Sequence, residues 1–250
     1  MKSLRAAGIT DRGKVRANNE DRYLIIGKNS LQVFAVADGM GGHAAGEVAS
    51  SMALDAIQSY LNHYQKDIIA KAAEGESLRT TLEEMLSAAN EKVFTAGKNK
   101  PEYSGMGTTL TLLLFVSDCC WLAHIGDSRA YLLRQNRLVL LTEDHTLVSQ
   151  LVKNGQISEE ECADHPQRHI LTRALGTDNE AIFDVLPLEI KPGDRLLLCT
   201  DGLHGFVAEE EILAVAGQNK EPDDIVGDLV FLANEKGGMD NITIVLIDVV

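Results

Sequence analysis

Residues 31–42 read LQVFAVADGMGG, an apolar run that stops at Asp38 and continues into glycine-rich sequence. Six of the seven residues 31–37 are apolar, and a short apolar run bounded by turn formers is typical of a buried strand. Asp38 and Gly39 favour turns, so they mark the end of this strand. The stretch therefore predicts a buried strand that delivers an aspartate to the edge of a sheet.

The same arrangement occurs at three other apolar runs: LAHI precedes Gly126-Asp127, LLLCT precedes Asp201, and Asp240 opens the run ITIVLIDV. Each aspartate alone has an ordinary explanation as a turn former. None of them, however, is followed directly by Lys or Arg. If the strands share sheets, the carboxylates converge and repel one another unless a proton or a cation neutralises them. Carboxylates without His or Cys partners favour Mg²⁺ or Mn²⁺. The sequence does not show the convergence itself.

The remaining segments complete an α+β pattern. Apolar runs predict strands at 31–37, 109–116, 121–125, 130–133, 195–199 and 242–249, with weaker candidates at 23–26 and 183–190. Helical spacing predicts long helices over 44–64 and 78–94, and shorter ones starting near residues 146, 158, 209 and 223. Strands and helices do not alternate regularly, which favours helices covering largely antiparallel sheets over a doubly wound parallel sheet. No linker or repeat interrupts the chain, so residues 1–250 are predicted to form a single domain.

Composition narrows the classes of partner. The formal net charge is −14, and no run of Lys and Arg offsets it. Such an acidic surface repels phosphate backbones and anionic lipids, so we expect no nucleic-acid and no membrane partner. The four cysteines form no Cys-x-x-Cys, no signal peptide is evident, and no apolar run is long enough to span a bilayer. These features predict a cytoplasmic protein with reduced cysteines.

Residues 39–44 also fit the glycine-rich pattern of a dinucleotide-binding fold, because they follow a strand and precede a helix. Two observations count against this interpretation. Asp38 would place a carboxylate beside the pyrophosphate, and the region where a second strand should end in an acidic residue is instead predicted to be helical. A P-loop sequence is absent as well.

Taken in order, a series of short segments resembles the metal-dependent serine/threonine protein phosphatases of the protein phosphatase 2C type, particularly the compact bacterial members. The resemblance extends from residue 8 to residue 249, and each segment alone is weakly specific. The matching segments are residues 13–16 with 19–21, 36–43, 105–109, 124–129, 144–145, 171–176, 199–203 and 238–243.

The resemblance implies a four-layer αββα sandwich, in which two central antiparallel sheets are flanked by pairs of helices. A channel at one edge of the sandwich would hold two cations, Mn²⁺ or Mg²⁺. Asp38 would bridge both cations, Asp201 and Asp240 would complete the first, and the carbonyl of Gly39 would bind the second. Asn241 is expected to orient its neighbour rather than bind metal.

The resemblance also implies roles around these ligands. Glu20 would act through metal-bound water, and Asp127 with Asp201 would hold a third, looser cation. Arg16 matches the phosphate-gripping arginine of the family, and its planar fork suits two phosphate oxygens. Paired cations lower the pKa of a bridging water, offset the charge of the phosphate and align the nucleophile. The implied reaction is hydrolysis of phosphoserine and phosphothreonine on proteins, which reverses a serine/threonine kinase.

One position departs from the animal and plant members, which carry a histidine, proposed as the general acid, directly after the Asp-Gly. Met40 stands there in this chain, and His43 lies three residues later. His43 is a candidate for the acid, but it could equally cap or pack against the following helix, and a metal-bound water could supply the proton instead. Residues 144–173 resemble the variable flap of the family, where His145 is expected to be solvated and the loop to contact the substrate protein.

Two other functions compete with the phosphatase interpretation. A non-catalytic metal-binding regulatory protein of the same fold is the alternative, although the presence of all the core carboxylates argues against it. Another metal-dependent phosphoesterase, such as a nuclease, is disfavoured by the acidic charge. The expected partners are phosphorylated proteins, among them a serine/threonine kinase and its substrates, and the chain is expected to be a monomer.

Overall fold

The computed structural model describes residues 3–28, 30–42, 45–75, 77–162 and 165–250. In this part of the chain the strands form two sheets, and every pairing is antiparallel. The first sheet has the order β1 (Leu4–Asp11), β11 (Ile242–Val249), β10 (Arg195–Cys199), β7 (Arg129–Arg134), β8 (Arg137–Leu140). The second has the order β2 (Asp21–Lys28), β3 (Leu31–Met40), β5 (Leu110–Val116), β6 (Cys119–Ile125), β9 (Asp184–Leu188), with β4 (Gly107–Thr108) paired to β3.

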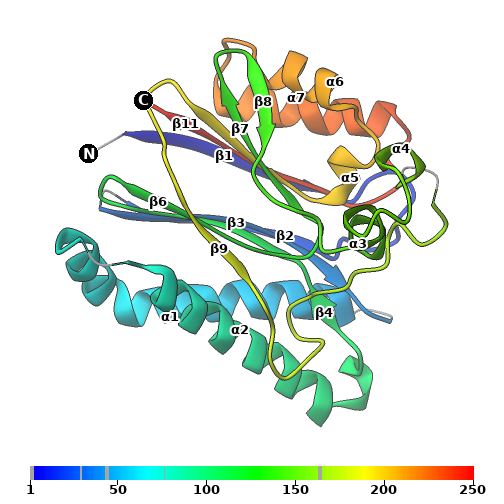
Figure 1. The fold of residues 1–250 in the computed structure, drawn as a ribbon, viewed down its shortest axis with the longest axis horizontal. Helices are drawn as coiled ribbons and strands as arrows, with labels where there is room; N and C mark the ends of the chain where they lie inside the picture. Colours follow the sequence, from blue (N-terminus) through cyan, green and yellow to red (C-terminus); the bar gives the residue numbers. More distant parts are fainter. Residues whose placement is uncertain (1–2, 29, 43–44, 76, 163–164) are drawn as a thin grey trace.

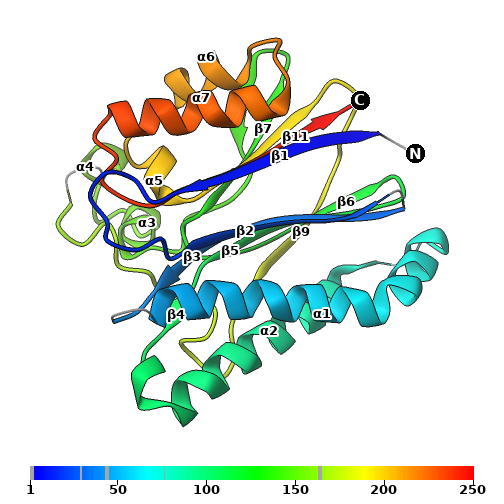
Figure 2. The same ribbon diagram turned by 180° about the vertical axis from the view of Figure 1, so that it is seen from behind.

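Helices cover the outer face of each sheet (Figures 1 and 2). The second sheet is covered by α1 (Ala45–Ala73) and α2 (Arg79–Asn99), and the first by α6 (Glu209–Ala216) and α7 (Pro222–Glu235). The short helices α3 (Leu147–Lys153), α4 (Glu159–Cys162) and α5 (Asp201–His204) gather at one end of the sandwich. A 3₁₀ turn, η1 (Pro101–Tyr103), follows α2. None of the described helices combines the length and the apolarity needed to cross a bilayer.

The apolar runs of the sequence are continuous because the central strands are buried on both faces. In β3, Val33 and Ala35 pack toward α1 and α2, whereas Phe34 and Val36 pack against the first sheet. Residues of β10 and β11 in the first sheet, such as Leu198, pack against these side chains and complete the apolar layer between the sheets. Full burial of a large apolar side chain contributes roughly 1.5–3 kcal/mol, so this layer fixes how the two sheets face each other.

The predicted α+β four-layer sandwich is confirmed, and the long strands and helices lie close to their predicted ranges. The predictions were wrong in places where the apolar signal is weak. Strands β1 and β8 were not predicted, because both lie at sheet edges and their residues are mostly half-buried or exposed. Helix α1 continues well beyond residue 64, to Ala73.

Strand β3 also ends at a different residue from the one predicted. Strand β3 does not stop before Asp38 but runs on to Met40, because β4 pairs with its last residues, Gly39 with Thr108 and Met40 with Gly107. Asp38 therefore sits inside a hydrogen-bonded strand. Thr109 holds both main-chain groups of Asp38, since the Asp38 carbonyl accepts from the Thr109 N–H at 2.8 Å and the Asp38 N–H donates to the Thr109 hydroxyl at 2.9 Å.

Asn90 on α2 provides a test of how the loop beside β4 is held. The Asn90 side chain is buried; it accepts from the Gly176 N–H at 2.7 Å and donates to the carbonyls of Asp178 and Asn179 at 3.0 and 3.2 Å. Asn90→Ala leaves these main-chain groups without their partner, so we expect a loss of about 2–4 kcal/mol in the free energy of unfolding, measured by urea denaturation. The exposed neighbour variant Glu91→Ala should change it by less than about 0.5 kcal/mol. Equal losses in the two variants would contradict this role.

Candidate metal centre

The structure brings together the four aspartates that the sequence singles out, at one edge of the sandwich. Asp38 lies in β3 of the second sheet, and Asp127 lies in the turn between β6 and β7. Asp201 is the first residue of α5, directly after β10, and Asp240 precedes β11. Asp38 is close enough to the other three for their charges to act on it. Because β10 and β11 belong to the first sheet, both sheets contribute carboxylates to the same place.

The carboxylates perturb one another strongly. Burial, followed by the charges of Asp21, Asp201, Asp127 and Asp240, raises the pKa of Asp38 well above its ordinary value. Burial and the charge of Asp240 raise the pKa of Asp201 to about 6, although a hydrogen bond with Asp38 opposes the shift. Burial and the charge of Asp201 raise the pKa of Asp127 to about 8. Such shifts mark a place where negative charge is concentrated without enough compensation.

The donor chemistry fits a hard divalent cation. Oxygen donors dominate the cluster, and the buried Oδ1 atom of Asp201 has no hydrogen-bond partner within the described residues. A buried carboxylate oxygen without a partner is costly, and a bound cation would satisfy it. Across the described ranges, however, no group of three or more His, Cys, Asp or Glu side chains is arranged so that it could hold an ion as it stands. The fit therefore rests on donor type, burial and charge.

Close packing explains why Gly39 is glycine. A Cβ atom on Gly39 would lie 2.0 Å from the carbonyl oxygen of Gly46 in the first turn of α1 and 2.7 Å from that of Glu20. Gly46 is confined in turn, because a Cβ there would lie 2.7 Å from Oε2 of Glu20. The start of α1 therefore presses against β3 at the candidate centre. The Glu20 side chain lies in the same place, where burial raises its pKa.

Arg16 contacts the cluster from the solvent side. Its Nη2 atom donates to Oδ2 of Asp240 at 2.7 Å, and more than half of its side-chain surface is exposed. The predicted phosphate-binding residue therefore lies at the mouth of the site, with one arm of its fork on a candidate metal ligand. His43 lies outside the described residues, so its proposed role as the acid stays a prediction.

The side chain of Asn241 forms hydrogen bonds with three main-chain groups of the loop before β2, rather than with its neighbour Asp240. Its Oδ1 atom accepts from the N–H of Glu20 at 2.8 Å, and its Nδ2 atom donates to the carbonyls of Arg12 and Asn18 at 3.0 and 2.9 Å. The side chain therefore anchors the loop that carries Arg16 and Glu20 to the start of β11. The contact with the neighbouring Asp240 comes from the main-chain N–H of Asn241 instead, at 2.8 Å.

The sequence assigned no role in the site to two residues that lie near the aspartates. Asp21 is only 1% exposed and lies directly opposite Asp38 in the β2–β3 pairing. Its Oδ2 accepts from the hydroxyl of Thr200 at 2.7 Å, and burial raises its pKa to about 7. His204 forms a hydrogen bond of 3.0 Å between its Nε2 atom and the main-chain carbonyl of Asp127. The pairing register would have revealed Asp21, but the register is not readable from one sequence.

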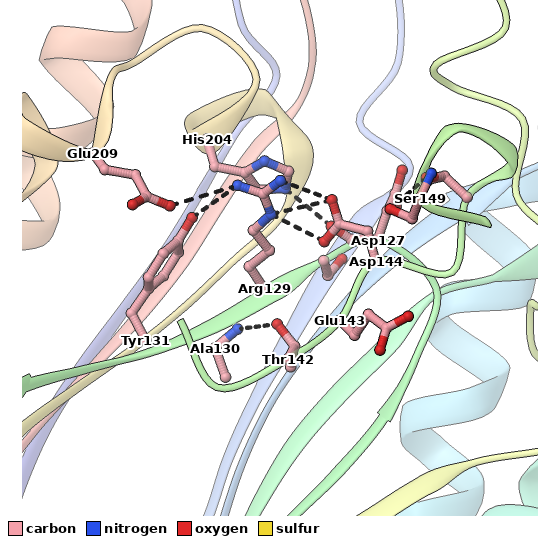
Figure 3. Close-up of polar contacts among 12 residues, drawn as sticks. Asp127, Arg129, Ala130, Tyr131, Thr142, Glu143, Asp144, Ser149, His204 and Glu209 are labelled. Atoms are coloured by element: carbon pink, nitrogen blue, oxygen red, sulfur yellow. Dashed lines mark hydrogen bonds and ion pairs between the residues drawn. The ribbon is translucent and has the colours of Figure 1, made fainter. Parts of the chain in front are cut away.

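A cavity of about 630 Å³ opens beside the cluster, and Asp127 and Asp201 form part of its wall. The flap helices α3 and α4 line it on another side. In the same region Arg129 is held by Asp144, with the shortest contact at 2.8 Å, and it lies near Tyr131, His204 and Glu209 (Figure 3). The cavity therefore lies between the candidate centre and the flap.

The expectation that His145 is solvated is wrong. His145 is 5% exposed, and its Nδ1 atom accepts from the N–H of Gly126 at 3.2 Å. Its Nε2 atom pairs with Oδ2 of Asp184 at 3.1 Å, and Arg173 contacts both side chains. His145 thus ties the start of the flap to the turn that carries Asp127, which is a structural task.

The chain is similar to known protein phosphatases. A family model described as protein phosphatase 2C matches residues 11–223. The serine/threonine protein phosphatase PstP of Mycobacterium tuberculosis (strain ATCC 25618 / H37Rv) is 43% identical over 247 residues, which is 99% of this chain and 45% of that protein. The serine/threonine phosphatase stp of Listeria welshimeri is 37% identical over 240 residues, which is 96% of this chain and 93% of that protein. The chain therefore spans less than half of the mycobacterial relative and nearly all of the Listeria one.

Solved structures show the same likeness. The Mycobacterium tuberculosis serine/threonine phosphatase PstP/Ppp matches with a TM-score of 0.86 and 41% identity, over 100% of this chain and 99% of that chain. The catalytic domain of serine/threonine protein phosphatase PstP, in complex with two manganese ions, matches with a TM-score of 0.82 and 39% identity over 100% of both chains.

The raised carboxyl pKa values predict an unusual dependence of stability on pH. Metal-free protein should lose thermal stability as the pH rises from about 7 to about 8.5, with Tm falling by about 4 °C. In this window the unfolded carboxyls are charged, whereas Asp127, whose pKa is raised to about 8, still binds a proton in the folded chain, so rising pH favours unfolding. The buried histidines do not contribute, because their pKa values are lowered below the ordinary 6.5.

The measurement is thermal unfolding in the presence of a chelator, repeated with excess Mn²⁺, which should remove the fall by binding the folded state. Asp38→Asn, which removes one buried charge, should make the fall shallower. A metal-free Tm that stays constant or rises across this window would contradict the electrostatic account.

Proposed function

Because the chain belongs to the protein phosphatase 2C family, we propose that it hydrolyses phosphoserine and phosphothreonine monoesters on proteins at a centre of two divalent cations, Mn²⁺ or Mg²⁺. The observation that carries the proposal is the convergence of Asp38, Asp127, Asp201 and Asp240 from both sheets, with mutually raised pKa values. The apolar layer shared by the two sheets supports treating residues 1–250 as one catalytic domain. The manganese-containing PstP structure supports the choice of cation.

Each residue takes a distinct part in holding the cations. Asp38 is proposed to bridge them, Asp201 and Asp240 to complete one, and the carbonyl of Gly39 to bind the other. Glu20, beside the start of α1, contributes from the outer side. When bound, paired cations supply hydroxide near neutral pH and offset the charge of a phosphate.

Asp127 is proposed to hold a third and looser cation together with Asp201. Both residues line the cavity beside the flap. The pKa of about 8 for Asp127 means that a proton occupies this carboxyl at neutral pH unless a cation displaces it. A proton and a cation thus compete for this carboxyl.

Arg16 is proposed to orient the substrate phosphate. The contact with Asp240 places its guanidinium at the mouth of the centre, where a planar fork can take two phosphate oxygens. If Asp240 binds a cation, its carboxylate would release Arg16, and a substrate phosphate could take its place on the guanidinium. The proton for the leaving alkoxide comes from His43 or from water, and only a variant at His43 separates the two.

The biological setting follows from the same family. Phosphorylated proteins are the proposed substrates, and the opposing enzyme is a serine/threonine kinase. We also propose a monomeric, cytoplasmic enzyme, and the acidic charge of −14 supports the proposal that it has neither a nucleic-acid nor a membrane partner. A non-catalytic metal-binding regulator of the same fold is the competing function, and the test below separates the two.

Metal-stripped protein should release phosphate from a phosphothreonine peptide only after Mn²⁺ or Mg²⁺ is restored. Asp38→Ala should lower kcat by at least about 10²-fold, which is about 2.7 kcal/mol of transition-state stabilisation, because it removes the proposed bridging ligand. The circular dichroism spectrum of the variant should match that of wild type, which would establish that the variant is folded. Metal-restored protein that binds Mn²⁺ but releases no phosphate would favour the regulator.

Arg16→Ala should raise KM for the phosphopeptide by about tenfold and lower kcat less, because a charge-assisted contact to the phosphate is lost. Arg16→Lys should lie between wild type and Arg16→Ala, since it keeps the charge but not the fork. Lys14→Ala, which removes an exposed cation of the same loop that pairs with Glu235, is the matched control. If Lys14→Ala and Arg16→Ala change KM and kcat equally, Arg16 contributes only its positive charge and no specific contact to the phosphate.

A further inference from the structure

Helix α5 is a single turn, Asp201–His204, that contacts two of the other strand ends at the candidate centre, the start of β11 and the turn between β6 and β7. It begins with Asp201, directly after β10. Its second residue, Gly202, packs on the start of β11 so closely that a Cβ atom there would lie 1.9 Å from the carbonyl oxygen of Asn241. Its last residue, His204, forms the 3.0 Å hydrogen bond to the Asp127 carbonyl. One helical turn therefore sets the relative positions of Asp127, Asp201 and the residue next to Asp240.

The imidazole of His204 acts here as a neutral donor. A carbonyl oxygen only accepts, so the Nε2 atom of His204 must carry the hydrogen. Burial and the charge of Arg129 lower the pKa of His204 to about 3. The guanidinium of Arg129 is in turn held by Asp144, and Glu209 lies 3.8 Å from it (Figure 3). The hydrogen bond to the Asp127 carbonyl therefore places the imidazole hydrogen of His204 on Nε2.

The turn that carries Asp127 is restrained on the side opposite His204 as well. It lies in the turn between β6 and β7, where its predecessor Gly126 has a φ of +108° that non-glycine residues rarely adopt. Thr109 lies under this turn, because a Cβ atom on Gly126 would be 2.5 Å from its Cγ2. The main-chain N–H of His145 donates to the carbonyl of Gly126 at 2.8 Å, in the peptide plane that precedes Asp127. The carbonyl of Asp127 is held from the opposite side by His204, so the peptide planes on both sides of Asp127 are fixed.

We propose that His204 is a positioning residue, which holds the main chain of Asp127 so that its carboxylate faces Asp201 and thereby sets the affinity of the cation shared by these two side chains. The inference rests on the proposed function, because it concerns the third cation of that centre. It assigns a task to a residue of α5 that touches neither the substrate nor the two tighter cations. His204 acts only by positioning Asp127. Replacing it should therefore weaken binding of the third cation and leave the affinities of the two tighter sites unchanged.

The test is a Mn²⁺ binding isotherm of the full chain, with free Mn²⁺ counted by its electron paramagnetic resonance signal. Wild type should bind two Mn²⁺ tightly and a third more weakly. His204→Leu fills the same space without a donor and should weaken the third class about tenfold, while the two tight sites change less than about twofold. His204→Gln places an amide N–H near the position of Nε2 and should restore the third class to within about threefold of wild type.

Tyr131→Phe is the matched control. It removes the 3.2 Å contact between the Tyr131 hydroxyl and Arg129 in the same network but does not touch Asp127, so it should leave the isotherm unchanged. A purely structural role for His204 would lower thermal stability equally in His204→Leu and His204→Gln and weaken Mn²⁺ binding equally in both. That result, or an unchanged third class in His204→Leu, would overturn the proposal.

A double-mutant cycle with Asp127→Asn tests whether His204 acts through Asp127. If His204 acts through Asp127, His204→Leu should have no further effect on Mn²⁺ binding once Asp127 is changed. Additive losses would show that the two residues act independently and would overturn the inference. A wild-type isotherm with only two Mn²⁺ would overturn it too, whereas turnover of a small phosphate ester in that same sample would keep the proposed function intact.

Discussion

Mutual repulsion among buried carboxylates is the constraint on which the rest of this structure depends. Asp38, Asp21, Asp127 and Asp201 lie in one desolvated region, and each holds a raised pKa because of burial and of the others. Without restraint from the fold or a neutralising cation, the carboxylates of such a cluster would move apart or take up protons. It persists because two sheets, joined by an apolar layer, meet at the edge where these residues lie.

Hydrogen bonds from neutral side chains hold the cluster in place without adding charge. The Thr108 hydroxyl donates to the carbonyl of Asp38 at 2.8 Å, and the Thr109 hydroxyl contacts that of Ser128 at 2.7 Å. Thr200 donates to Asp21 and accepts from the N–H of Thr243 at 3.0 Å. Such contacts restrain the main chain of the strands while leaving the carboxylates short of positive charge, which is the condition that a divalent cation can satisfy.

The sequence predicted the parts of the fold that are buried on both faces and the parts of the site that come from strand ends. Strands β10 and β11 were placed to the residue, because a continuous apolar run is unambiguous when turn formers bound it. Strands β1 and β8 escaped because edge strands alternate between half-buried and exposed residues. Asp21 and His204 escaped for a different reason, since their contacts join residues far apart in the chain and depend on register and on a four-residue helix.

The central claim is that the converging aspartates form a metal centre, and anomalous scattering tests it most directly. Crystals grown with Mn²⁺ should be measured above and below the manganese absorption edge, for wild type and for Asp38→Asn. The account predicts two strong anomalous peaks among Asp38, Asp201 and Asp240 in wild type, and loss of at least one of them in the variant. A wild-type map without manganese at these aspartates, or with unchanged peaks in Asp38→Asn, would contradict it.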